Sequence, residues 1–103
     1  MSWYTVGKRR DVPADRGWPV QVGDRRIAVF AVGADLFAVD NVCRHVGNPI
    51  DDGHVEHGCV TCPWHGWRYD LRTGDQVMMF GRRPGLRTYP VRSAGEDVQV
   101  DIS

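Results

Sequence analysis

The sequence has no excess of charge of either sign. Its 13 Lys and Arg residues balance 13 Asp and Glu residues, which gives a formal net charge of +0 at pH 7. A protein that binds nucleic acid through bulk electrostatics has a clear basic excess, so that class is excluded. Six arginines nevertheless fall between positions 68 and 92. Either they belong to a mixed, solvated surface, or some of them attract an acidic partner, for which the candidates are Arg82, Arg83 and Arg87.

Long apolar segments are also missing. The run at residues 27–32 is followed at once by Gly33-Ala34-Asp35, and it is far shorter than the ~18 residues of a membrane-spanning helix. The first six residues, MSWYTV, do not show the basic segment followed by an apolar one that marks a secretory signal. We therefore expect a soluble, cytoplasmic protein with neither a membrane nor a nucleic acid as partner.

Cysteine is scarce. The three cysteines, Cys43, Cys59 and Cys62, cannot all pair with one another, which excludes the disulfide framework of small secreted proteins. At 103 residues the chain has room for one domain, residues 1–103, with a modest core. A redox pair of Cys59 and Cys62 is conceivable, but we favour a partly buried Cys59 that packs like a small apolar side chain.

Two short segments do stand out, because in each a cysteine is followed closely by a histidine. The first is Cys43-Arg44-His45, and the second, seventeen positions beyond that histidine, begins with Cys62 and reaches His65. If the two segments lie side by side, the thiolates fall at one depth and the imidazoles at another. Such a site suits a [2Fe–2S] cluster, with one iron bound by Cys43 and Cys62 and the other by His45 and His65.

A single zinc ion is the alternative occupant of four Cys and His ligands. Common Cys2His2 zinc sites take both cysteines from one segment and both histidines from the other, so the alternation found here argues against zinc. His54 and His57 compete for the ligand positions. Neither has a cysteine at the matching spacing, and we expect both to be exposed hairpin residues.

At this point the sequence resembles the Rieske iron–sulfur family. Residues 43–49, CRHVGNP, are similar to the first cluster loop of that family, and residues 62–70, CPWHGWRYD, are similar to the second. The resemblance is specific over residues 43–74 and looser over the other strands. It implies one [2Fe–2S] cluster per chain, with Cys43, His45, Cys62 and His65 as its ligands.

The resemblance also implies how the cluster is tuned. The respiratory members join their two loops by a disulfide, and this chain has Asn48 and Trp64 at those positions. Trp67 stands where high-potential members have a serine that bonds a cluster sulfur, whereas Tyr69 stands where another hydroxyl donor is found. We therefore expect a potential towards the lower end of the Rieske range of ~−150 to +300 mV. The family also implies that Pro84 packs over the cluster.

Outside the two loops, short runs rich in Val, Ile, Phe and Tyr indicate β-strands separated by Gly- and Pro-containing turns. Strands are expected at residues 3–6, 20–22, 27–32, 36–39, 55–56, 59–61, 67–70, 77–80, 86–91 and 98–102, and a loop at residues 81–85. The last strand alternates, so one of its faces should be buried. The predicted fold is all-β, an antiparallel sandwich or barrel into which a small cluster-binding subdomain, about residues 41–70, is inserted.

Two functions follow from the resemblance. The first is a free one-electron carrier, similar to the ferredoxin components that pass electrons from a reductase to a ring-hydroxylating oxygenase. The second is a small subunit fixed in an NAD(P)H-dependent nitrite reductase, and the intact ligand set favours the carrier. The Rieske domain of a terminal oxygenase is not expected, since no 2-His-1-carboxylate iron site is left. We expect a monomer that transfers electrons and is not a catalyst by itself; a zinc-holding interaction module is the remaining non-redox alternative.

Overall fold

The computed structural model describes residues 2–44, 47–64 and 66–102. The described chain consists of strands and one short 3-10 helix, η1 (Arg9–Asp11). The strands are β1 (Trp3–Lys8), β2 (Trp18–Val22), β3 (Arg25–Val32), β4 (Asp35–Asp40), β5 (His54–Glu56), β6 (Cys59–Thr61), β7 (Arg68–Asp70), β8 (Gln76–Met78), β9 (Gly81–Arg83), β10 (Thr88–Tyr89), β11 (Val91–Ala94) and β12 (Asp97–Asp101). The described residues contain no helix that is long and apolar enough to cross a membrane.

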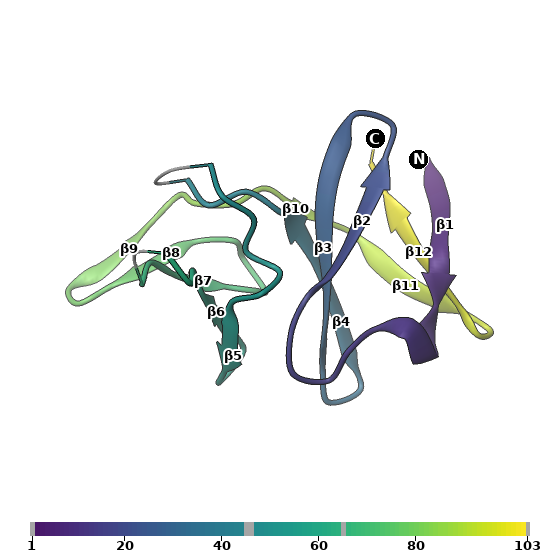
Figure 1. Ribbon diagram of the computed structural model, residues 1–103, viewed down its shortest axis with the longest axis horizontal. Helices are drawn as coiled ribbons and strands as arrows, with labels where there is room; N and C mark the ends of the chain where they lie inside the picture. The colour runs from purple at the N-terminus through teal and green to yellow at the C-terminus, as the bar shows by residue number, and fades with distance from the viewer. Residues whose placement is uncertain (1, 45–46, 65, 103) are drawn as a thin grey trace.

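The strands form three antiparallel sheets, with the orders β1-β12-β11, β10-β4-β3-β2 and β5-β6-β7-β8-β9. Figure 1 shows the sheet of β2, β3, β4 and β10 in the middle of the molecule, with the five-stranded sheet at one end and the sheet that holds both termini at the other. The predicted all-β antiparallel class is confirmed.

The position of β3 explains why residues 27–32 are apolar without interruption. Ile27 and Val29 pack into one core cluster with Val98 and Val100 of β12, whereas Ala28 and Phe30 pack into a second cluster on the side of the five-stranded sheet. Because successive side chains of a strand point to opposite faces, a strand covered on both faces must be apolar at every position. The middle sheet therefore supplies one wall of each core.

The end of the chain differs from the strand predicted at residues 86–91. Within this range Thr88–Tyr89 forms β10, which pairs with β4, and Val91 already belongs to β11. Pro90 has no N–H to continue the ladder, and the chain crosses after it to the terminal sheet, where β11 pairs with β12. The buried face predicted for the last strand is confirmed by Val98 and Val100, which are fully buried.

Two further expectations were wrong in their limits. Residues 81–83, expected in a loop, form β9 and pair with β8 through the register Val77↔Arg82. Arginine is not typical of buried strands, and here it is tolerated because β9 is an exposed edge of the sheet. Trp67 lies outside β7, which begins at Arg68. The expected boundaries of the subdomain, residues 41–70, stay a prediction, while the five-stranded sheet itself runs from His54 to Arg83.

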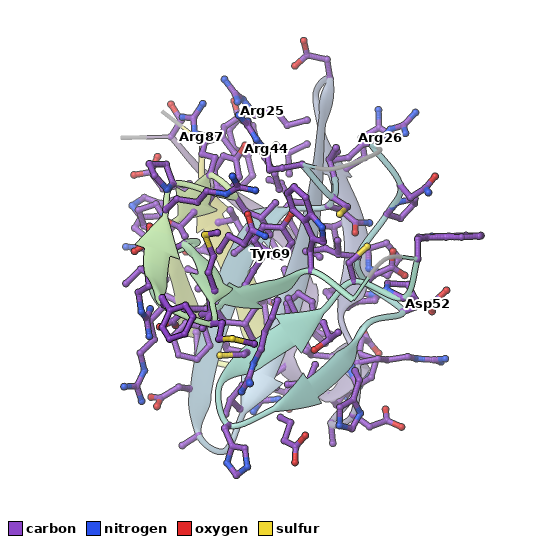
Figure 2. The ribbon with its side chains drawn as sticks, turned by 90° about the vertical axis from the view of Figure 1, so that its left-hand side faces the viewer. Arg25, Arg26, Arg44, Asp52, Tyr69 and Arg87 are labelled. Atoms are coloured by element: carbon purple, nitrogen blue, oxygen red, sulfur yellow. The ribbon has the colours of Figure 1, made fainter. Side chains whose placement is uncertain are left out.

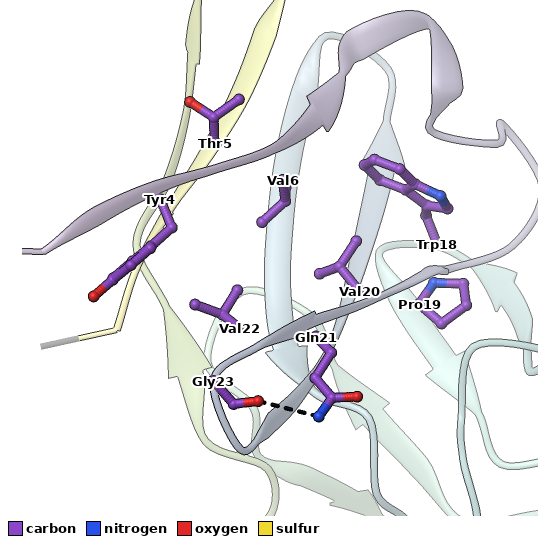
Figure 3. A pocket seen from close by; sticks show the side chains of 9 residues that line it. All are labelled: Tyr4, Thr5, Val6, Trp18, Pro19, Val20, Gln21, Val22 and Gly23. Carbon is purple, nitrogen blue, oxygen red and sulfur yellow. Dashed lines mark hydrogen bonds between the residues drawn. The ribbon is translucent and has the colours of Figure 1, made fainter.

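A cleft of about 470 Å³ separates the facing sheet edges β1 and β2 (Figure 3). Its walls include Tyr4 and Val6 from β1 and Trp18, Val20 and Val22 from β2. Neither Cys43 nor Cys62 lines it. The candidate site lies instead where the middle and five-stranded sheets meet.

Candidate metal centre

The first ligand loop, residues 43–48, is closed by its own backbone. The Cys43 N–H donates to the Asn48 carbonyl at 2.7 Å, and the Gly47 N–H donates back to the Cys43 carbonyl at 2.7 Å. Gly47 has φ +76°, a conformation that glycine adopts without the steric penalty other residues meet. The loop therefore turns tightly around the cysteine. His45 and Val46 lie outside the described residues.

The second ligand loop, residues 62–67, repeats this pattern. The Cys62 N–H donates to the Trp67 carbonyl at 2.7 Å, and the Gly66 N–H donates to the Cys62 carbonyl at 3.0 Å. Gly66 has φ +74°. Each cysteine thus begins the same two-bond ring, although the predicted histidine is the third residue of the first loop and the fourth of the second. His65 also lies outside the described residues.

The two predicted cysteine ligands come together in one apolar environment. Cys43 is 0% exposed and Cys62 is 1% exposed, and both belong to the core cluster that contains Ile50, Val60 and Tyr69. A thiolate in such surroundings is unfavourable unless a cation or hydrogen-bond donors compensate its charge. Two buried sulfurs at the base of two matched loops are therefore suited to a metal centre.

Tyr69, on β7, provides one such donor. Its hydroxyl lies 3.6 Å from the Cys43 sulfur and accepts a hydrogen bond from the Arg44 backbone N–H at 3.1 Å. A metal-bound thiolate can only accept, so the Tyr69 O–H would donate to it. Burial, and then the hydrogen bond to Cys43, raise the pKa of Tyr69 well above its usual value, which keeps the phenol protonated. The hydroxyl expected near the sulfur is in place.

Asn41 closes the segment that contains the first loop, a role that the sequence analysis did not predict. Its side-chain oxygen accepts from the N–H groups of Ile50 at 2.8 Å and Asp51 at 3.0 Å, while its amide donates to the Asp51 carboxylate at 2.9 Å. Asn41 is 7% exposed. Asn41 therefore joins the two ends of the segment that contains the first loop. It is a single polar residue, and no periodic pattern in the sequence indicates what it binds.

The competing residues lie apart from this site. His54 and His57 are exposed, as expected, and their imidazoles lie 3.3 and 3.5 Å from the carboxylate of Glu56. Cys59 is buried on β6, in register with Asp70, as expected for a packing thiol. Within residues 2–44, 47–64 and 66–102, no group of three or more His, Cys, Asp or Glu side chains forms an alternative metal site.

Comparison with known proteins agrees with this geometry. A family model described as the Rieske [2Fe-2S] domain matches residues 2–90. The ferredoxin subunit of anthranilate 1,2-dioxygenase from Burkholderia cepacia is 34% identical over 98% of this chain and 93% of its own length. The ferredoxin component of the naphthalene 1,2-dioxygenase system of Pseudomonas putida is 31% identical over 100% of this chain and 98% of its own.

Solved structures share the fold over its whole length. A ferredoxin from Sphingomonas yanoikuyae B1 superposes with a TM-score of 0.86 at 25% identity, covering 99% of this chain and 100% of its own. A ferredoxin seen in complex with the oxygenase of carbazole 1,9a-dioxygenase gives a TM-score of 0.82 at 25% identity, covering 95% and 91%. A protein described as a nitrite reductase NADPH small subunit gives 0.83, covering 97% and 98%, but at 18% identity it shares the fold alone.

Proposed function

This chain belongs to the Rieske [2Fe-2S] domain family, and from that premise we propose that it is a cytoplasmic one-electron carrier between a reductase and a terminal oxygenase. The observation that carries the proposal is the match, over 98% of this chain and 93% of the relative, to a dioxygenase ferredoxin subunit. A relative aligned over its whole length supports a common role more strongly than a shared fold does.

In this proposal the four ligands are Cys43, His45, Cys62 and His65. The bound [2Fe–2S] cluster supplies one-electron transfer, and the protein determines its orientation, environment and access. Cys43 and Cys62 would hold one iron within the apolar core, where both sulfurs are almost fully buried. The imidazoles of His45 and His65 would hold the other iron. Matched backbone rings in the two loops support this assignment, because each fixes its cysteine at the start of a closed turn.

The donors around the sulfurs set how readily the centre is reduced. The hydroxyl of Tyr69 faces the Cys43 sulfur, and a donor to a thiolate stabilises the more negative, reduced state. Trp67 offers no hydroxyl at the other position that the family uses. One such donor, in place of two, supports a potential in the lower part of the ~−150 to +300 mV range.

Arginines near the site support docking with an acidic partner. In Figure 2, Arg25, Arg44 and Arg87 lie on the same upper side of the molecule, above Tyr69. Arg82, which we had also considered, is paired with Asp70 at 2.6 Å, so its charge is largely balanced within the chain. Arg44 and Arg87 are therefore the better candidates for attracting carboxylates at low ionic strength.

The test is reconstitution of electron transfer. The purified holoprotein, an NADH-dependent flavin reductase and, in turn, the oxygenases of the anthranilate, naphthalene and carbazole systems are mixed with their substrates. We expect catalytic amounts of the chain to restore substrate oxidation by at least one oxygenase, over many turnovers. If none of the three oxidises the reduced chain, the carrier role is contradicted. Co-elution with a larger reductase in fixed ratio would instead support the nitrite reductase subunit.

A further inference from the structure

Two large apolar side chains are almost fully exposed to solvent at the turn between β8 and β9. Met79 is 89% exposed and Phe80 is 94% exposed. Together we call them the hairpin tip. Figure 1 places the β8–β9 hairpin at the end of the molecule that is farthest from the two termini. Large apolar side chains that nothing covers are typical of surfaces that bind a partner.

The turn itself does not require these residues. Met78 pairs with Gly81 across the hairpin, so the tip is a two-residue connection, and Gly81 supplies the positive φ, +117°. Connections of this length favour Asn, Asp and Gly. Met and Phe at both central positions neither form the turn better nor gain burial within the chain. Residues that do not suit their local structure and do not add stability are expected at positions that serve a function.

The base of the hairpin is fixed on both faces of β9. On one face, Arg82 pairs with the carboxylate of Asp70 at 2.6 Å, which lowers the pKa of that carboxyl. On the other face, the Arg83 side chain donates to Gln76 at 2.6 Å, and its guanidinium lies 5.0 Å from the centre of the Trp67 ring. Only the tip is left without such contacts among the described residues. The base of the hairpin is therefore held in place, while its apolar tip is exposed.

The base of the hairpin is connected to the second ligand loop. Trp67, on which Arg83 packs, is the last residue of that loop, and its carbonyl accepts the Cys62 N–H at 2.7 Å. A partner that grips the hairpin tip is thus held in a defined position relative to Cys62. Docking of this kind favours transfer, because it selects one arrangement of donor and acceptor before the electron moves.

We propose that Met79 and Phe80 are the apolar anchor with which this carrier docks into a pocket of its electron-accepting oxygenase. The assignment rests on the proposed function. Arg83 lies close to the tip on β9, and its guanidinium is held by two neutral groups, the Gln76 side chain and the Trp67 ring, so it keeps its positive charge. Acidic residues should therefore surround the pocket on the oxygenase. A cation at a fixed position suits carboxylates at fixed positions on a protein better than the mobile headgroups of a lipid surface.

The experiment compares Phe80→Ser and Met79→Ser with the wild-type holoprotein. Serine is common in turns, and Gly81, which supplies the positive φ, is unchanged in both variants, so the hairpin should be retained. Tyr4→Ser, on β1 in the terminal sheet, is the matched control, since Tyr4 is 46% exposed. Visible and paramagnetic resonance spectra and chemical reduction by dithionite first establish that every variant holds an intact cluster. The apparent KM for each variant is then measured with an oxygenase that the wild type reduces, chosen from the anthranilate, naphthalene and carbazole systems.

We expect the KM to rise about ten- to a hundredfold for Phe80→Ser, as for loss of a central aromatic anchor, and to stay within about twofold for Tyr4→Ser. The rate at saturation should change little. An unchanged KM in both tip variants would overturn the assignment. So would tip-dependent sedimentation with phosphatidylserine vesicles, which would make the tip a membrane anchor, or tip-dependent self-association of the chain. A wild type that reduces none of the oxygenases would overturn the proposed function itself, and this docking mode with it.

Discussion

The two ligand loops have the same backbone ring but are held in different ways. In both, the cysteine N–H donates five residues onward, and a glycine four residues onward donates back to the cysteine carbonyl. The second loop connects β6 and β7, whose pairing of Thr61 with Arg68 closes it. Among the described residues, the strands that precede and follow the first loop, β4 and β5, do not pair with each other. Instead, the Asn41 side chain accepts hydrogen bonds from the N–H groups of Ile50 and Asp51, which follow the loop.

This difference shows that one side chain can replace a strand pair in closing a ligand loop. The first loop depends on a few buried polar groups, and the second on a ladder shared by several residues. Loss of the side chain that closes the first loop should therefore be more severe than loss of a single side chain from the strands that close the second.

The largest effect is expected at the cysteines themselves, where the two loops should respond alike. Cys43→Ser and Cys62→Ser should each abolish cluster binding and much of the stability, because ligation ties the loops together. Cys59→Ser is the control and should leave the iron content unchanged. Iron analysis and thermal unfolding measure both properties. Loss of iron in Cys59→Ser would show that the wrong cysteine was assigned to the second loop.

Asn41→Ala should show that the two loops differ in how they are held. Removing the amide leaves the buried N–H groups of Ile50 and Asp51 without their acceptor, which costs about 1–3 kcal/mol for each group left unsatisfied. The control for the second loop is Thr61→Ala in β6. Strand pairing there uses only the backbone, so the free energy of unfolding should change by no more than about 0.5 kcal/mol. Denaturant unfolding of the two variants provides the comparison. Equal destabilisation would contradict the special role of Asn41.

The matched glycines should give smaller and equal effects. Gly47 and Gly66 have φ +76° and +74°, and no described atom lies within 4 Å of a Cβ built at either position. Substitution by Ala therefore adds backbone strain without a clash, about 1–2 kcal/mol at each site. Unfolding of Gly47→Ala and Gly66→Ala measures it. A difference of more than about 1 kcal/mol between them would show that the two rings are not equivalent.

The smallest effect concerns the potential. Tyr69→Phe removes the donor beside the Cys43 sulfur, which disfavours the reduced state. A hydrogen bond worth about 0.5–1.5 kcal/mol corresponds to a fall of about 20–60 mV for one electron. Tyr89→Phe, at a buried tyrosine outside the cysteine cluster, should shift the potential much less. Protein-film voltammetry records both values, and equal shifts would remove the special role of Tyr69.

Much of the fold and of the candidate site could be predicted from the sequence, because the features that indicate them are local. The apolar runs at residues 27–32 and 36–39 predicted the strands β3 and β4, and the spacing of Cys and His predicted both loops. The crossover at Pro90 was missed, since strand pairing with β4 depends on contacts distant in sequence. Asn41 was missed because the N–H groups that it accepts belong to the backbone, which leaves no mark on composition. The exposure of Phe80 was missed because an apolar run does not reveal whether anything covers it.

The central claim is that these two loops together bind one [2Fe–2S] cluster through two thiolates and two imidazoles. Iron, zinc and acid-labile sulfide analysis of the purified protein, combined with electron paramagnetic resonance of its reduced form, tests this claim most directly. The predicted result is about two irons and two sulfides per chain, with the rhombic, low-average-g signal of mixed Cys and His ligation. One zinc per chain without labile sulfide, or the signal of an all-cysteine cluster, would contradict it.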